Sequence, residues 1–346
     1  MRKQVFELDA AIVSSASIVG KKESEGPLGD RFDLFDTSDR FGEKTWEAAE
    51  SEMQRRALNT ALAKRGIHDR DVDVLFAGDL LNQCVGSAYG LMDFDIPYFG
   101  LYGACSTCAE GLLLASSLIS ASFCDRAAAV TSSHYCSAER QYRFPIEYGG
   151  QRAPGAQWTV TGSGAFLLEH AEGNELRAVI RRGMPGKVHE RGINDANNMG
   201  AAMAPAAEDT LLRYFSATGT RPEDYDRIVT GDLGYEGGSI LCDLLRADGY
   251  AISDRYADCG MLIFDREGQD VHGGGSGCGC SAVVLSAHFL PLLESGELSR
   301  ILFLSTGAMM SPDSIKQGQN IPAVAHLVQI ESPSARDGKK TGGKSR

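Results

Sequence analysis

The sequence lacks an excess of basic residues. Among its 346 residues are 34 Lys and Arg but 46 Asp and Glu, which gives a formal net charge of -12 at pH 7. Nucleic acid is bound through clustered Lys and Arg, so this balance argues against a nucleic-acid partner. It also means that an anionic ligand has to be met by a local group of basic residues, because the overall charge does not attract it.

Long apolar runs are absent as well. No stretch reaches the roughly 18 apolar residues that a membrane-spanning helix needs, and the first residues, Met1–Asp9, contain no apolar segment of signal-peptide length. The sequence therefore predicts a soluble protein without a signal peptide, which other proteins would have to hold at a membrane. Nine cysteines, an odd number in a chain without an export signal, indicate reduced thiols.

What the sequence does contain is an internal duplication. Residues 66–80 read Gly-Ile-His-Asp-Arg-Asp-Val-Asp-Val-Leu-Phe-Ala-Gly-Asp-Leu, and residues 219–233 read Gly-Thr-Arg-Pro-Glu-Asp-Tyr-Asp-Arg-Ile-Val-Thr-Gly-Asp-Leu. At an offset of 153 (219 minus 66), several positions hold identical residues. They are Gly66, Asp71, Asp73, Gly78, Asp79 and Leu80. Matches in register of this kind predict two copies of one structural unit.

A second pair of segments shares a local pattern. Gly103–Cys108 and Gly277–Ser281 each open a helix of small residues. Each helix leads to an arginine that precedes a short apolar strand, Arg126 in the first copy and Arg300 in the second. The offset is now 174 (300 minus 126), so the second half carries additional residues between the two matched regions.

Together the copies predict an α/β fold of two duplicated βαβαβ-type halves, with central sheets covered by helices. Before Gly66, apolar residues at three-to-four spacing predict a helix that ends at this glycine in the left-handed conformation. We expect an N-terminal half at residues 1–175 and a C-terminal half at residues 176–331. Residues 332–346 are polar and basic and are predicted to be disordered.

Cys105 stands between the apolar run 96–102 and the predicted helix 109–120. A thiol at a helix N-terminus faces unpaired N–H groups and the positive end of the helix dipole, which favours the thiolate. Such a turn also suits a carboxylate ligand. The alternative interpretation is a small buried residue where helix meets sheet, because free cysteines are commonly buried.

Cys105 and Cys108 also form a Cys-x-x-Cys pair, so redox and zinc roles have to be considered. Cys278 and Cys280 would supply the two further ligands of a tetrahedral zinc site. The duplication explains small residues at both helix starts without a metal. We therefore predict neither a metal site nor a cofactor.

The segments Gly103–Thr107 and Gly275–Ser281 resemble the thiolase superfamily, including the type III ketoacyl synthases. The resemblance implies a thiolase-like fold. It also implies a cysteine, here Cys105, that attacks an acyl thioester with help from a His and from an Asn or a second His.

This sequence departs from that pattern at the assisting residues. Gly-Asp-Leu-Gly-Tyr follows the predicted strand 227–230, and no His occurs between His189 and His272. Ser276 stands about where the synthases keep Asn, and His272 would be at most a displaced base. A condensing enzyme needs a positioned base and an oxyanion site. We therefore predict that the protein is not an enzyme, with a condensing enzyme that uses Cys105 as the alternative.

Longer strings resemble a narrower group, the stage V sporulation protein AD family of spore-forming bacteria. The strings, which extend over nearly the whole chain, are Glu25–Gly29, Ala77–Gln83, Gly103–Thr107, Ser132–His134, Ala138–Pro145, Glu147–Gln151, Thr161–Ala165, Met199–Pro205 and Ala257–Gly260. The resemblance implies binding of dipicolinic acid, free or as its calcium complex, for uptake into the developing spore. It further implies membrane-embedded partners in the same complex, peripheral association with the spore inner membrane through them, and a homodimer.

Dipicolinate is a flat pyridine with two carboxylates, so its site needs cations, hydrogen-bond donors and an apolar wall. If the stretch around Arg140 and Arg143 is helical, the two arginines lie on one face and could hold carboxylates, and Tyr142 and Tyr148 would supply aromatic walls. In the alternative interpretation the two arginines pair with Glu139 and Glu147. The predicted ligand-binding residues are Asn82, Cys105, His134, Arg140, Arg143, Tyr148 and Ser276.

Overall fold

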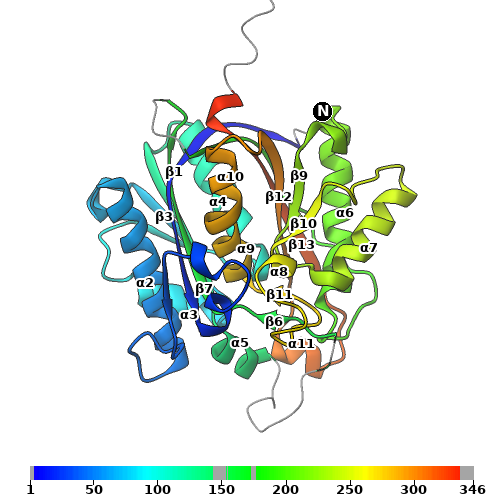
Figure 1. Ribbon diagram of the computed structural model, residues 1–346, viewed down its shortest axis with the longest axis horizontal. Helices are drawn as coiled ribbons and strands as arrows, with labels where there is room; N and C mark the ends of the chain where they lie inside the picture. Colours follow the sequence, from blue (N-terminus) through cyan, green and yellow to red (C-terminus); the bar gives the residue numbers. More distant parts are fainter. Residues whose placement is uncertain (1–3, 143–152, 154, 173–176, 336–346) are drawn as a thin grey trace, which may run out of the picture.

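The computed structural model describes residues 4–142, 153, 155–172 and 177–335, which form a large mixed sheet with helices on its faces (Figure 1). The 11-stranded sheet has the order β10-β9-β12-β13-β8-β1-β7-β5-β3-β4, with β2 beside β1. Its strands are β1 (Phe6–Gly20), β2 (Leu34–Asp36), β3 (Val74–Gly78), β4 (Tyr98–Gly100), β5 (Arg126–Ser133), β7 (Gly162–His170), β8 (Ala178–Met184), β9 (Arg227–Thr230), β10 (Tyr256–Asp258), β12 (Arg300–Ala308) and β13 (Ala323–Glu331).

The strand order is the same in both halves when it is read outward from the centre. One half runs β1-β7-β5-β3-β4 and the other β8-β13-β12-β9-β10. In each half the two outer pairings are parallel, and the inner ones are antiparallel. The halves meet where β1 pairs antiparallel with β8. This topology confirms the predicted duplication and places both copies in one continuous sheet.

Helices form three layers around the strands (Figure 1). α2 (Trp46–Arg65) and α3 (Val85–Leu91) cover the first half, and α6 (Met199–Thr218) and α7 (Gly234–Ala247) cover the second. Between the halves lie α4 (Thr107–Ser120), α9 (Cys278–Val284), a π-helical turn (Leu285–Phe289) and α10 (Leu290–Glu294). Shorter helices are α1 (Lys21–Ser24), α5 (Tyr135–Tyr142), α8 (Cys259–Leu262) and α11 (Pro312–Lys316).

The repeated glycines and aspartates have the same local task in each half. Gly66 ends α2 with φ of 74°, and Gly219 ends α6 with φ of 67°, a conformation that glycine adopts without steric cost. Asp73 accepts hydrogen bonds from two backbone N–H groups, including that of Arg126 at 2.9 Å. Asp226 does the same for Arg300 at 2.9 Å. These matched positions therefore build the turns that start matched strands.

The central helices hold the two halves together through a shared apolar core. Leu112 of α4 and Val284 of α9 are fully buried in it, together with Phe166 of β7 and Phe303 of β12. Burial of a side chain of this size contributes about 1.5–3 kcal/mol. The segments that begin α4 and α9 are therefore held side by side between the two halves of the sheet, and this is where the site forms.

The described chain ends at Ala335. Ser332, the first residue of the predicted tail, is buried, and its N–H donates to the carbonyl of Ser299 at 2.9 Å. Residues 336–346 lie outside the described residues. Within the described ranges, none of the helices combines the length and the apolar character required to cross a bilayer.

Candidate functional site

Cys105 lies in a 3-10 turn, Ala104–Ser106, that leads directly into α4. Ala104 has φ of 50°, the left-handed region that a non-glycine residue seldom occupies. The turn is held by the hydroxyl of Ser106, which donates to the carbonyl of Gly103 at 2.6 Å. The strained turn thus places a buried Cys105 at the junction of the two halves, where its thiol faces a cavity.

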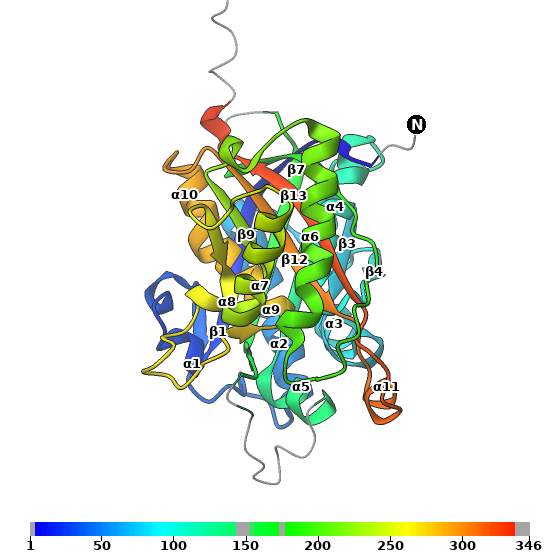
Figure 2. The same ribbon diagram turned by 90° about the vertical axis from the view of Figure 1, so that its right-hand side faces the viewer.

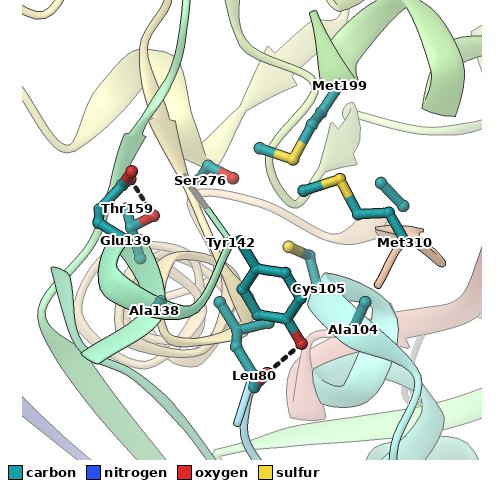
Figure 3. Close-up of a pocket in the computed structure, with 11 residues that line it drawn as sticks. Leu80, Ala104, Cys105, Ala138, Glu139, Tyr142, Thr159, Met199, Ser276 and Met310 are labelled. Carbon is teal, nitrogen blue, oxygen red and sulfur yellow. Dashed lines mark hydrogen bonds between the residues drawn. The ribbon is translucent and has the colours of Figure 1, made fainter. Parts of the chain in front are cut away.

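The cavity beside Cys105 is lined by residues from both halves (Figure 3). The lining residues are Leu80, Ala104, Cys105, Ala138, Glu139, Tyr142, Thr159, Met199, Ser276, Ala308 and Met310. Thr159 and Ser276 come together because β6 (Trp158–Thr159) pairs in parallel with β11 (Gly275–Ser276). Of the residues predicted from the sequence, Cys105 and Ser276 line this cavity.

Asp232 is the carboxyl group beside Cys105. It follows β9 and is fully buried. Its Oδ2 accepts from the N–H of Gly277 at 2.9 Å and from the hydroxyl of Ser276 at 3.3 Å, and its Oδ1 accepts from the hydroxyl of Thr306 at 2.9 Å. This aspartate therefore stands after the strand where the synthases carry a histidine.

The ionisation of Cys105 is set by burial and by Asp232. Burial raises the pKa of the Cys105 thiol well above 9.0, and the negative charge of Asp232 raises it further. Burial also raises the pKa of Asp232, to about 6, against the opposing hydrogen bonds it accepts. At neutral pH a protonated thiol therefore faces a carboxylate. The thiolate favoured by the helix dipole does not form, because desolvation outweighs the dipole.

No residue that the structure places around the cavity is a histidine. His272, considered above as a displaced base, lies exposed with its Nε2 at 2.8 Å from Oδ1 of Asp270. Within the described ranges, His, Cys, Asp and Glu side chains form no group of three or more that could hold a metal ion. All nine cysteines are free thiols.

Asn82 lies next to the cavity wall. Its Oδ1 accepts from the hydroxyl of Tyr102 at 3.0 Å and from Nε2 of Gln141 at 3.2 Å. The hydroxyl of Tyr142 donates to the carbonyl of Leu80 at 2.6 Å and lies 3.2 Å from the hydroxyl of Tyr102 (Figure 3). Asn82 thus holds two neighbours of Tyr142, and Tyr142 itself forms the wall.

Arg140 belongs to α5, but its side chain does not line the cavity. It forms an ion pair with Glu47 of α2 and is about half exposed (46%). Glu139, weighed as its partner, is buried and accepts from the hydroxyl of Thr159 at 2.8 Å. Arg143 and Tyr148 of the predicted site lie outside the described residues.

His134 directly follows β5, at the expected edge of the sheet, but its ring packs away from the cavity. Its Nε2 lies 2.8 Å from the carbonyl oxygen of Asp39, and its Nδ1 accepts from the N–H of Cys136 at 3.2 Å. The ring contacts that of Trp46 at a centroid distance of 5.4 Å. Burial lowers the pKa of His134, so a neutral ring joins three segments here.

Sequence reasoning missed Asp232 as a site residue. The signal was present, since Asp232 matches Asp79 in the duplication. Asp79 caps a turn, as the sequence suggests, by accepting from the N–H of Leu81 at 2.8 Å. Met199 and Met310 were missed as well, and only the packing of the second half brings them to the cavity.

Comparison with known proteins identifies one family and one fold. The family model for stage V sporulation protein AD matches residues 1–331. Stage V sporulation protein AD of Bacillus subtilis (strain 168) is 43% identical over 327 residues, which cover 94% of this chain and 96% of that protein.

Solved structures of similar shape include two variants of OleA from Xanthomonas campestris. A variant in which a histidine is replaced by asparagine has a TM-score of 0.61 at 15% identity. A variant in which a glutamate is replaced by glutamine has a TM-score of 0.60 at 16% identity. Each comparison covers 95% of this chain and 100% of the OleA chain. OleA has the thiolase fold, and the likeness confirms that fold for this chain.

Proposed function

The chain belongs to the stage V sporulation protein AD family, and we propose that its part in sporulation is to bind dipicolinic acid, free or as its calcium complex, for uptake into the developing spore. The protein does not act on this ligand chemically. It holds the ligand beside Cys105.

The observation that carries this proposal is the position of the Cys105 thiol, which lies beside Asp232 in a cavity that no described histidine lines. A nucleophilic cysteine needs a base that accepts its proton, whereas here the neighbouring group is Asp232, whose charge opposes ionisation of the thiol by raising its pKa. The cavity therefore offers Cys105 as a hydrogen-bond donor. Ser276 and Thr159 add hydroxyl groups, and the side chains of Tyr142, Met199 and Met310 add apolar contacts.

The cavity has to widen to admit an aromatic ring. Its volume is about 50 Å³, enough for a few water molecules, whereas ligand pockets usually measure roughly 300 Å³ or more. Met310 and Met199 have flexible side chains that adapt to a ligand. Rotation of Tyr142 would break its hydrogen bond to Leu80, at a cost of about 1 kcal/mol. Binding is therefore expected to involve movement of these side chains.

Calorimetry of the full chain with dipicolinate, with and without calcium, tests the proposal. We expect saturable binding that Cys105→Phe weakens by about tenfold or more, because the larger ring fills the cavity. Cys242→Ser on α7, a change of a cysteine that does not line the cavity, should leave the affinity unchanged. Circular dichroism would verify that both variants fold. An absence of binding heat for the wild-type protein at millimolar dipicolinate would rule the proposal out.

Acyl transfer through Cys105 is the alternative function, favoured by the thiolase fold and by a cysteine at the start of α4. Incubation with an acyl-coenzyme A followed by mass spectrometry separates the two. An acyl group that forms on Cys105 and turns over would show acyl transfer and contradict the binding proposal. An unmodified chain would support the binding proposal.

The same proposal includes association of this protein with the spore inner membrane. Membrane-embedded subunits of the sporulation complex would hold this protein at the spore inner membrane, and the protein would pair as a homodimer. Deletion of residues 336–346 should then leave recovery in the membrane fraction largely intact, because a few basic residues add only about 1 kcal/mol each. Sedimentation would measure the pairing.

A further inference from the structure

A second hollow, here called the access groove, lies between α5 and α11. It is lined by Arg140, Gln141, Tyr142, Pro312, Ile315 and Lys316. The two helices lie at the same end of the molecule in both views (Figures 1 and 2). The volume of the groove is about 360 Å³, which falls in the usual range for small-molecule sites. The groove therefore has the room that the cavity beside Cys105 lacks.

Tyr142 connects the groove with the cavity. The same residue lines both hollows. Its hydroxyl is held by the carbonyl of Leu80 and lies close to the hydroxyl of Tyr102, which in turn donates to Asn82. Tyr142, whose hydroxyl makes these two contacts, is thus the residue that the groove and the cavity share.

The charges of the two hollows differ. Arg140 of α5 and Lys316 of α11 place one cation on each wall of the groove, and none of its described lining residues is acidic. Arg140 also pairs with Glu47. For Lys316 the structure records no ion pair within the described ranges, and its side chain is exposed. The cavity, by contrast, is lined by the carboxyl of Glu139 and, among described residues, by neither Lys nor Arg.

A dicarboxylate that binds to this acidic protein needs local cations, and the groove supplies them. The protein carries a net charge of -12, so attraction of a dianion depends on a local pair of cations. Arginine holds a carboxylate through two parallel hydrogen bonds, and a lysine ammonium meets a second carboxylate as a point charge. Ile315 and Pro312 supply an apolar surface for the ring, and Tyr142 an aromatic one.

We propose that the access groove is the subsite where an aromatic dicarboxylate first binds, with its carboxylates on Arg140 and Lys316, before Tyr142 swings aside and admits the ring to the cavity beside Cys105. This inference rests on the proposed function and adds the residues that recognise the charge of the ligand. It assigns Tyr142 the role of a gate between the two hollows.

Binding of dipicolinate to the full chain, measured by calorimetry and surface plasmon resonance at several salt concentrations, tests the subsite. Lys316→Glu reverses one charge of the groove and should lower the affinity by about tenfold, mainly through a slower association rate and with a shallower salt dependence. Lys316→Gln should show an intermediate loss. Lys44→Glu is the matched control, since Lys44 is exposed and lines neither hollow, and it should bind within about twofold of the wild type.

The outcomes separate this inference from the proposed function. If wild type and Lys316→Glu bind alike, the groove is not the subsite, while the proposed function stands. If the wild type does not bind dipicolinate, both the proposed function and the subsite are wrong. Equal losses in Lys44→Glu and Lys316→Glu would show a general charge effect and would also overturn the subsite. Circular dichroism of each variant verifies folding.

Discussion

The carboxylate of Asp232 lies beside the thiol of Cys105 and, through its charge, raises the pKa of that thiol. A neutral histidine at this place would accept the proton and leave a thiolate. An aspartate in a buried, hydrogen-bonded setting keeps the thiol protonated instead. The residue type at position 232, just after β9, therefore influences the ionisation of Cys105.

Asp232→Asn should make Cys105 more reactive. The substitution removes the charge that opposes the thiolate, so the pKa of Cys105 falls, although burial keeps it above 9.0. The rate of alkylation by iodoacetamide at mildly alkaline pH should rise roughly tenfold for each unit by which the pKa falls. Mass spectrometry of the modified protein measures this rate, with Cys242 as an internal reference. An unchanged rate at Cys105 would contradict the electrostatic role of Asp232.

Tyr142→Phe should speed ligand exchange. The variant keeps the ring but loses the hydrogen bond to the carbonyl of Leu80, which contributes about 1 kcal/mol to the closed position. Association and dissociation rates for dipicolinate should both rise about fivefold, with little change in affinity. Surface plasmon resonance gives both rates. Tyr89→Phe, at an exposed tyrosine of α3, is the control. If the rates of Tyr142→Phe equal those of the wild type, Tyr142 is not a gate.

Glu50→Gln should change how stability depends on pH. Burial raises the pKa of Glu50 from 4.5 to about 8, and the charge of Asp79 adds to this. The folded protein therefore holds a proton that the unfolded chain releases above a pH of about 4.5, so the free energy of unfolding falls as the pH rises toward about 8. In the variant the free energy of unfolding should decrease less steeply with pH, by on the order of 1 kcal/mol per pH unit. Urea unfolding across this range measures it.

Glu52→Gln, on the same helix, is the control, because the pKa of Glu52 is shifted in the opposite direction. Burial opposes ionisation of Glu52, but hydrogen bonds from Arg55 and Arg56 outweigh it and lower its pKa. Its contribution to stability is present above the unfolded pKa and is lost as the pH falls through the folded pKa. The variant should therefore be less stable than the wild type at neutral pH, and the difference should shrink in acid. If both variants shift in the same direction, burial is not what controls Glu50.

Much of the fold follows from short-range patterns that the sequence shows directly. Gly66 and Gly219 end helices, and Asp73 and Asp226 bind backbone N–H groups at the start of matched strands. These tasks depend on local backbone geometry, so identical residues at a fixed offset predict them. The position of Cys105 just before a helix was predictable for the same reason.

The sequence by itself thus determined the duplicated α/β architecture, the turn that carries Cys105 and the lack of a histidine after β9. Only the tertiary structure decided which side chains surround that cysteine. Asp232 and Met310 reach it because the two halves pack around α4 and α9, whereas Arg140 turns toward Glu47. Contacts between residues that are 93 or more positions apart, as these are, depend on how whole layers pack, and no local pattern contains that information.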